Sequence, residues 1–275
     1  MTAVIGGLYI YPVKSAAGIS LDTARLEPYG LQHDREWMIV DPAGRFITQR
    51  DEGRLALLRT ALDSTTSGAG TLRLSNPQGA GPVVALAHEG KRVSVQVWGA
   101  RCDAFDAGTE AADFLSEWLG RPLRLVRFDP AGRRLSNQDW TAGREVPTLF
   151  TDGYPMLVLS RASIEDLAAR VGHALPVERF RPNLLIDGVT AYAEDDANRL
   201  KTGGVELALT KACTRCVITT IDQDTGARHA GEEPLATLKR YRYNSELRGV
   251  VFARNAYAIA GTGAILARGQ ELSLE

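Results

Sequence analysis

The clearest chemical signal in the sequence is a pair of cysteines, Cys213 and Cys216, in the segment ACTRCVITTIDQDTG. The β-branched run that follows predicts that the pair lies at the mouth of a strand, which would fix the direction of each thiol. A structural zinc site needs four ligands, but Cys102 is the only other cysteine and the four histidines have no ligand spacing. A thioredoxin-like pair would open a helix instead. The third interpretation is a thiolate ligand for a heavier, softer metal, and Arg215 beside Cys216 would favour the anionic form.

The elements that must position these thiols are mostly strands. Short β-branched or aromatic runs occur at VIGGLYIYPV, REWMIVD, RFITQ and KRVSVQVW, and later at MLVLS, NLLID, VELAL, CVITTID, GVVFARNAYAIA and ELSL. Helical spacing predicts a helix over residues 109–120 that stops at Gly120, a second with Ser163 and Asp166 as its cap signal, and a third starting at Pro234. Many short strands with few helices favour a β-rich α+β fold with barrel-like sheets over a doubly wound sheet.

The composition excludes several classes of protein. The chain has 275 residues, 44% hydrophobic and 24% charged, which can bury one large core or two modest ones. No apolar run approaches the roughly 20 residues that span a bilayer, and the start MTAVIGGLYIYPVKS lacks a basic leader and a cleavage site. A net charge of -1 provides no global field for nucleic acid. We expect a cytoplasmic protein with reduced thiols that binds neither membrane nor nucleic acid.

Longer segments around the cysteines resemble a known family. ERFRPNLLIDG, YAEDD and VELALTKACTRCVITTIDQDTGAR, in this order and spacing, resemble the MOSC domain of molybdenum cofactor sulfurases and of the mitochondrial amidoxime-reducing component. IYPVKSAAGISLDTARLEPYGLQHDREWMIVDPAGRFITQR resembles the N-terminal MOSC-associated β-barrel domain. The resemblance implies two domains, at residues 1–122 and 123–275. Only the aperiodic stretch at residues 130–147, a candidate boundary or lid, lacks a counterpart.

This resemblance implies that the cysteines serve a molybdenum cofactor, a metal held by a pterin dithiolene. In the relatives the second cysteine of the motif binds molybdenum, which falls on Cys216 here and leaves Cys213 as a neighbour. Thr214 and Arg215 match positions that contact the phosphate-bearing end of the cofactor.

Residues outside the motif match the cofactor cradle of the family. Lys14 and Ser15 follow a strand, where a lysine and a hydroxyl can bind a phosphate or pterin oxygen, although a solvated turn is the alternative. Arg35 matches an arginine that reaches the cofactor, although by itself it could be a surface residue. Arg181 and Asn183 offer a fork-shaped cation and an amide that suit a pterin, or alternatively a turn with a structural ion pair.

Two further residues, Asp152 and Asn255, match family positions that line the pocket. Two departures stand out, because relatives usually carry tryptophan at the position of Ala197 and glycine at the position of Ala253. We expect both to lie near the pocket, where they would affect the shape of the substrate that fits.

The implied activity is a reductase that removes oxygen from N-hydroxylated compounds such as amidoximes, hydroxylamines or hydroxylaminopurines. A carrier of the molybdenum cofactor, or a sulfur-handling protein, would use the same Cys216 without reductive turnover. A structural barrel without a cofactor is the third possibility, and metal analysis would distinguish it.

The source of electrons is expected to be a separate redox protein. An iron–sulfur cluster needs four cysteine ligands, and this sequence has only Cys102 outside the motif. We also expect no ferredoxin-like extension of the kind that some bacterial relatives carry, and no glycine-rich dinucleotide fingerprint is present.

Overall fold

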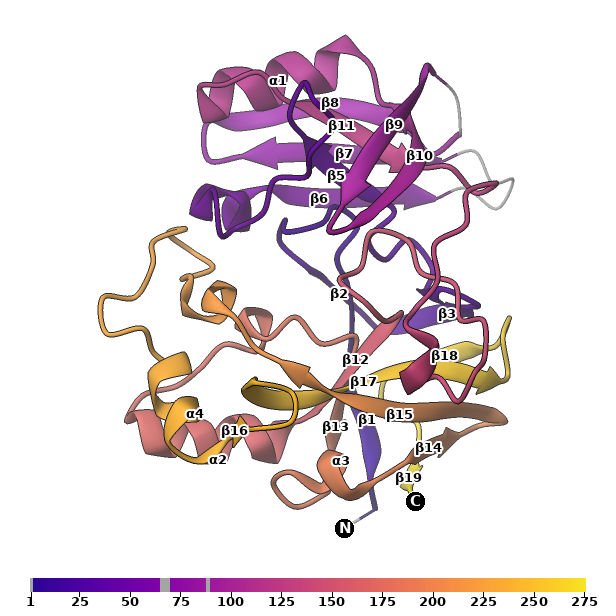
Figure 1. Cartoon of the computed structure of the whole chain (residues 1–275), viewed down its shortest axis with the longest axis vertical. Coiled ribbons are helices and arrows are strands. Elements are labelled where there is room, and N and C mark those ends of the chain that lie inside the picture. The colour runs from indigo at the N-terminus through magenta and orange to yellow at the C-terminus, as the bar shows by residue number, and fades with distance from the viewer. Residues whose placement is uncertain (1, 65–69, 88–89) are drawn as a thin grey trace.

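The computed structural model describes residues 2–64, 70–87 and 90–275 and is rich in strands (Figure 1). His88, one of the four histidines considered above, lies outside the described residues. The strands form two regions in Figure 1: a lower region that holds both ends of the chain, and an upper region built from the segment between them. The expected β-rich α+β fold is confirmed.

The lower region is organised around one long mixed sheet. Its strand order is β19-β14-β15-β17-β12-β13-β1-β2, with β16 beside β17. Only β12 and β13 pair in parallel, and helix α2 (Arg161–Val171) makes the crossover that a parallel pair requires. The strand bounds are β1 Val4–Ile10, β2 Ile19–Leu21, β12 Met156–Ser160, β13 Leu184–Asp187, β14 Arg199–Thr202, β15 Val205–Thr214, β16 Tyr243–Asn244, β17 Gly249–Ala260 and β19 Ser273–Leu274.

An aliphatic core fills the space between this sheet and a small one. Leu8 of β1 and Leu184 of β13 are fully buried opposite each other, and Leu26 of the small sheet packs into the same core. Ile5, Leu8 and Ile10 of β1 point into this core, and an irregularity in the pairing with β13 between Ile5 and Gly7 interrupts the simple alternation. The small sheet has the order β18-β3-β4, with bounds β3 Thr23–Glu27, β4 Gly30–Leu31 and β18 Ile265–Ala267.

The upper region contains two antiparallel sheets, β5-β11-β10-β9 and β6-β7-β8, and helix α1 (Thr109–Leu119). The helix packs against β8 and β11 and buries Leu115 in a second core. It ends at Gly120, which has φ 72° and donates its N–H to the Ser116 carbonyl (2.8 Å), so the predicted helix and its stop are confirmed. The strand bounds are β5 Trp37–Val40, β6 Arg59–Ser64, β7 Gly70–Asn76, β8 Gly79–Ala85, β9 Arg92–Val97, β10 Ala100–Asp106 and β11 Arg124–Phe128.

The predicted cap of the second helix is wrong by one turn. The hydroxyl of Ser160, not Ser163, accepts a backbone N–H at the start of α2 (3.1 Å). Ser163 is buried inside the helix and donates to Glu194 (2.8 Å), a long-range partner invisible in the local pattern. The predicted helix after Pro234 is confirmed as α4. The remaining helical bounds are α3 Ala193–Asp196, α4 Leu235–Tyr241, η1 Gly53–Leu57, η2 Gln138–Trp140, η3 Val177–Arg179 and η4 Val217–Thr220.

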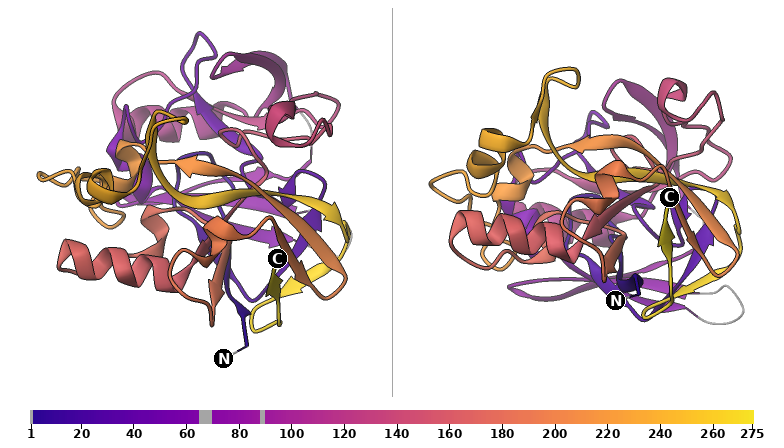
Figure 2. Two further views of the ribbon diagram at one scale, coloured as in Figure 1. Left: turned by 60° about the horizontal axis from the view of Figure 1, so that its bottom comes forward. Right: turned by 90° about the horizontal axis from the view of Figure 1, so that it is seen from below.

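The N-terminal strands belong to the lower region, together with strands from the second half of the chain. β1 pairs with β13 and β2, and β3 pairs with β18, so the first strands complete sheets whose other members come from the second half (Figure 2). Among the described residues, no helix has both the length and the apolar character that a membrane crossing requires.

We expect a fragment of residues 123–275 made alone to lack cooperative folding. It would leave the β13 edge unpaired and would lose Leu8 from the core, where removal of a single buried leucine side chain typically costs about 2–5 kcal/mol. Circular dichroism during thermal unfolding checks this, and co-expression with residues 1–122 should restore a single transition. A cooperative transition in the isolated fragment would show that β1 is dispensable.

Candidate functional site

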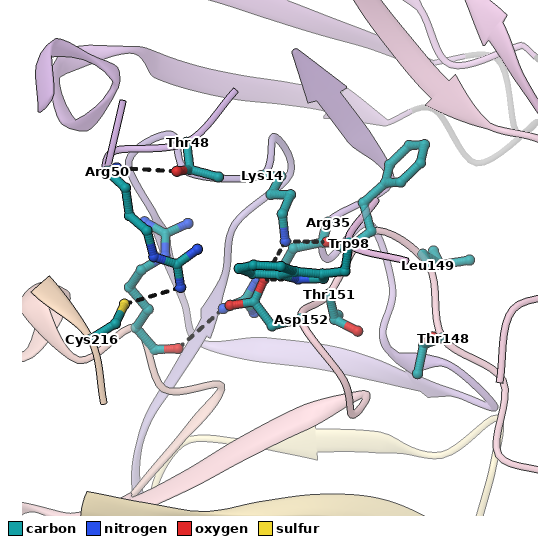
Figure 3. Close-up of polar contacts among 12 residues, drawn as sticks. Lys14, Arg35, Thr48, Arg50, Trp98, Thr148, Leu149, Thr151, Asp152 and Cys216 are labelled. Carbon is teal, nitrogen blue, oxygen red and sulfur yellow. Dashed lines mark hydrogen bonds and ion pairs between the residues drawn. The ribbon is translucent and has the colours of Figure 1, made fainter. Parts of the chain in front are cut away.

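All ten residues that the family resemblance assigned to the cofactor site line one cavity, which we call the thiol cavity. They come from both regions of the chain and from segments far apart in the sequence, and Figure 3 shows part of this arrangement. The residues are Lys14, Ser15, Arg35, Asp152, Arg181, Asn183, Thr214, Arg215, Cys216 and Asn255. Their contact with a cofactor stays a prediction, but their meeting at one place is observed.

Cys216 lies just after β15 and caps the short helix η4, with its thiol in the cavity. The run CVITTID is therefore not the predicted strand. The hydroxyl of Thr219 donates to the Cys216 carbonyl (3.0 Å) and that of Thr220 to the Val217 carbonyl (2.7 Å), so the threonines stabilise a 3₁₀ turn in place of a strand ladder. The turn separates the thiol from the sheet and presents it to the cavity.

The two thiols of the motif have different arginine partners. Arg50, from the first half of the chain, donates from Nη2 to Sγ of Cys216 (3.2 Å), as Figure 3 shows. Arg215 instead donates to Sγ of Cys213 (3.2 Å) and to the Phe180 carbonyl (2.8 Å). The arginine beside Cys216 in the sequence therefore contacts the other thiol of the motif.

Arg35 and Arg181 pack over the same buried ring. The Cζ atom of each guanidinium lies 4.2 Å from the centre of the Tyr11 ring. Arg35 donates to Asp34 (2.5 Å) and to Oδ1 of Asn183 (3.2 Å), whereas Arg181 donates to the Ala16 carbonyl (2.6 Å). Both cations are therefore held by the protein itself and form one wall of the cavity.

Positive charge is crowded in this wall. Burial, followed by the neighbouring Arg35, lowers the pKa of Arg181 to about 10. Burial also lowers the pKa of Lys14 from its ordinary value, against the opposing effect of Asp152. Cations whose pKa values fall in this way gain from a nearby anion, because it offsets both their desolvation and their mutual repulsion.

The backbone is strained where it presents these groups. Ser15 (φ 66°), Arg35 (φ 49°) and Arg181 (φ 58°) occupy the left-handed region, which side-chain-bearing residues rarely adopt. Such strain is concentrated at functional sites, where the surrounding structure holds the chain in place.

Lys14 and Asp152 form an ion pair at the mouth of the cavity. Nζ of Lys14 also donates to the Phe150 carbonyl (2.8 Å), and Oδ1 of Asp152 accepts from Nε1 of Trp98 (3.2 Å). Desolvation alone would raise the pKa of Asp152, but the charge and hydrogen bond of Lys14, together with Arg50 and the Trp98 N–H, hold the pKa below its usual range. Asp152 thus remains an anion that fixes Lys14 and Trp98 together.

Two asparagines have mainly supporting contacts. Oδ1 of Asn183, which is 1% exposed, accepts the Leu157 N–H (3.1 Å), and its Nδ2 donates to the Tyr9 carbonyl (3.1 Å). Asn255 on β17 donates from Nδ2 to the Lys211 carbonyl (2.8 Å). Asn183 therefore joins β1, β12 and β13 below the cavity.

The two family departures occupy different parts of the lower region. Neither Ala197 nor Ala253 lines the thiol cavity. Ala197 is 5% exposed in the aliphatic core of the lower region, and Ala253 is 2% exposed on β17 with φ 77°. A positive φ favours glycine, so the usual glycine at the position of Ala253 fits the backbone and not a substrate.

Sequence reasoning missed Arg50, which lines the cavity, and also Trp98 and Arg134, which contact Asp152 in its wall. RFITQ was expected to be a strand, but beyond isolated bridges the segment turns at Thr48, whose N–H and hydroxyl both donate to Asp51 (3.0 Å each). This turn directs Arg50 toward Cys216. A threonine followed three residues later by an aspartate is a recognisable turn signal and could have indicated it.

Arg134 stabilises the backbone segment that contains Asp152 and forms one wall of the cavity. It lies in the expected irregular connection, which is confirmed between β11 and β12, and it donates to the carbonyls of Leu149 (2.7 Å), Thr151 (2.8 Å) and Asp152 (3.1 Å). Figure 3 shows this wall beside Lys14 and Trp98. The connection thus supports the cavity from outside, and no contact identifies it as a lid.

We expect Arg134→Ala to destabilise the protein by about 1.5–3 kcal/mol, because several backbone carbonyls lose a charged donor. Urea unfolding measures this change. The matched control is Arg133→Ala, whose only partner in the described chain is the exposed Glu145 and which should cost less than about 1 kcal/mol. Equal effects of the two substitutions would mean that Arg134 does not hold the wall.

Two family models match the chain. The MOSC N-terminal beta barrel domain matches residues 2–122, and the MOSC domain matches residues 146–272. The chain belongs to the MOSC family. This MOSC protein is 36% identical over 248 residues to mitochondrial amidoxime-reducing component 1 of Mus musculus. The matched residues cover 86% of the chain and 71% of the relative. The Homo sapiens component 1 is also 36% identical, over 86% of the chain and 72% of the relative.

Solved structures add more distant similarity to this MOSC protein. The superposition on the YUAD protein from Bacillus subtilis covers 99% of the chain and 94% of the YUAD chain, with 14% sequence identity and a TM-score of 0.43. Within the described ranges, no three His, Cys, Asp or Glu side chains could hold a metal ion together.

Proposed function

We propose that this MOSC protein is a molybdenum-cofactor-dependent reductase of N-hydroxylated compounds. The observation that carries the proposal is the position of the Cys216 thiol in a cavity whose wall contains Lys14, Arg35 and Arg181. A soft-metal ligand and an anion-complementary wall are the two features that a phosphorylated pterin with a bound metal needs. The similarity to amidoxime-reducing components favours this reaction over others of the same cofactor.

The residues of the cavity fit the cofactor in distinct ways. Cys216 would provide the protein ligand of the metal, and Arg50 would hold that sulfur in place through its hydrogen bond. Lys14 and Arg181 would face the phosphate-bearing and pterin oxygens, with Ser15 and Thr214 adding hydroxyl groups. Arg35, fixed by the buried Asp34, would keep the wall positive.

When bound, the cofactor supplies the oxygen-atom acceptor and the two-electron chemistry. An N-hydroxylated substrate consumes two electrons and two protons and leaves as the reduced nitrogen compound and water. The protein contributes position, charge and a site partly shielded from solvent. We also propose that a separate redox protein donates the electrons, because the sequence has too few cysteines for a cluster of its own.

A second candidate is a carrier of the molybdenum cofactor or a sulfur-handling protein. The exposed side of Cys216, within reach of Arg50, would also suit a transferred sulfur. The two candidates differ in turnover, since only the reductase consumes an N-hydroxylated compound.

We expect Cys216→Ser to reduce bound molybdenum to background, while Cys213→Ser keeps most of it. A thiolate binds a soft metal far better than a hydroxyl, and Cys213 is held by Arg215 away from the sulfur of Cys216. Elemental analysis of protein made in cells that synthesise the cofactor gives the metal content. Loss of molybdenum from both variants to the same degree would remove the distinction between ligand and neighbour.

We expect the purified holoprotein to reduce an amidoxime with reduced viologen but not with NADH or NADPH alone. The chain carries neither a dinucleotide fingerprint nor cluster ligands, so pyridine nucleotides have no route to the cavity. Product formation measured by chromatography distinguishes the cases, with heat-treated protein as the control. Full occupancy with molybdenum but no turnover would favour the carrier.

A further inference from the structure

A second hollow adjoins the thiol cavity, and we call it the aromatic recess. Its volume is about 310 Å³, and Phe46, Gln96 and Trp98 form part of its wall. It shares Thr48 and Arg50 with the thiol cavity. Volumes of this size with aromatic walls and a few polar groups are typical of sites for small molecules.

Trp98 is held rigidly although its ring is 41% exposed. One edge of the ring packs against Phe46, with centroids 5.1 Å apart and planes at 61°. Its Nε1 donates to Asp152 (3.2 Å), and Arg50 lies over the ring at 4.7 Å. An exposed tryptophan normally has rotamer freedom, so three fixed contacts prepare this ring to receive a ligand.

The backbone at Trp98 is strained for this placement. Trp98 and Gly99 form the two-residue turn between β9 and β10, because Val97 pairs with Ala100. Trp98 has φ 52°, a conformation that glycine, asparagine or aspartate would adopt more easily in such a turn. Retaining a bulky ring there is unfavourable for folding, which indicates a role in binding.

The recess leads to the sulfur through Arg50. The guanidinium of Arg50 lies over Trp98 on one side and donates to Sγ of Cys216 (3.2 Å) on the other. A compact ligand in the recess would therefore lie one side chain away from the thiol, as the line Trp98, Arg50, Cys216 in Figure 3 shows.

We propose that the aromatic recess is the substrate subsite and that it selects planar, conjugated N-hydroxylated compounds, a proposal that rests on the proposed reductase function. A planar conjugated ring stacks on Trp98 and meets Phe46 edge-on, whereas a saturated ring of equal size lacks the π face for both contacts. Arg45 and Arg50 line the recess together with Asp51, so its charged lining is positive by one unit and favours a neutral substrate over a basic amine. Aromatic amidoximes and hydroxylaminopurines have the required shape and charge.

The kinetic test compares two substrates of matched size with the holoprotein and reduced viologen. Trp98→Ala should raise KM for benzamidoxime about tenfold and change KM for cyclohexanecarboxamidoxime less than about threefold, with kcat altered little. Trp98→Phe should restore most of the preference, because it keeps a π face. The matched control is Trp140→Ala, which removes a tryptophan of similar exposure (39%) outside both hollows and should change neither KM.

A binding test does not depend on turnover. In NMR titrations, benzamide, a planar neutral probe, should shift the indole N–H resonance of Trp98, whereas cyclohexanecarboxamide should shift it much less. The resonance is assigned by its loss from the spectrum of Trp98→Phe. An equal response to both probes, or equal KM changes for both amidoximes, would overturn the selectivity. If the wild-type holoprotein reduces neither amidoxime while benzamide still shifts Trp98, the reductase function fails and the recess stands as a site for planar ligands.

Discussion

Crowding of buried cations around Tyr11 is the constraint on which the rest of the site depends. Lys14, Arg35 and Arg181 meet within one cavity, and the carboxylates that face them are Asp34 and Asp152. Burial raises the pKa of Asp34, and Arg35 opposes that rise, so this pair stabilises its charges mutually. The arrangement is costly without an anionic ligand, and it explains why a strained backbone is tolerated at three of the positions involved. An anionic ligand such as the proposed cofactor would relieve this crowding.

The sequence predicted the regular elements where local pattern and tertiary packing agree. The helix over Thr109–Leu119 has both an apolar stripe and a glycine stop, and β9 alternates its valines as a half-buried strand does. The prediction failed where side chains form local hydrogen bonds that override the strand propensity of the segment. The threonines after Cys216 form a 3₁₀ turn despite their β-branched character, and Thr48 breaks the expected strand through Asp51.

The candidate site was predictable only in part, and for a physical reason. The family resemblance located the residues that present Cys216 and the cationic wall, and the structure places them in one cavity. Arg50 and Trp98 could not be found by spacing, because Arg50 meets a cysteine 166 residues away and Trp98 meets Asp152 54 residues away. Contacts between distant segments are decided by the packing of the two regions, which local sequence patterns do not encode.

The pairing of β1 with β13 also affects how the chain is made. Leu8 lies opposite Leu184, so the first strand leaves the ribosome long before its partner does. Until then β1 can pair only with β2, and its apolar face, with Ile5 and Ile10, lacks most of the sheet and core that bury it. The upper region is complete once β11 has been made to pair with β5, which is well before β13 is made. Synthesis therefore leaves an exposed strand beside an already folded region, a condition that makes nascent proteins slow to fold and dependent on chaperones.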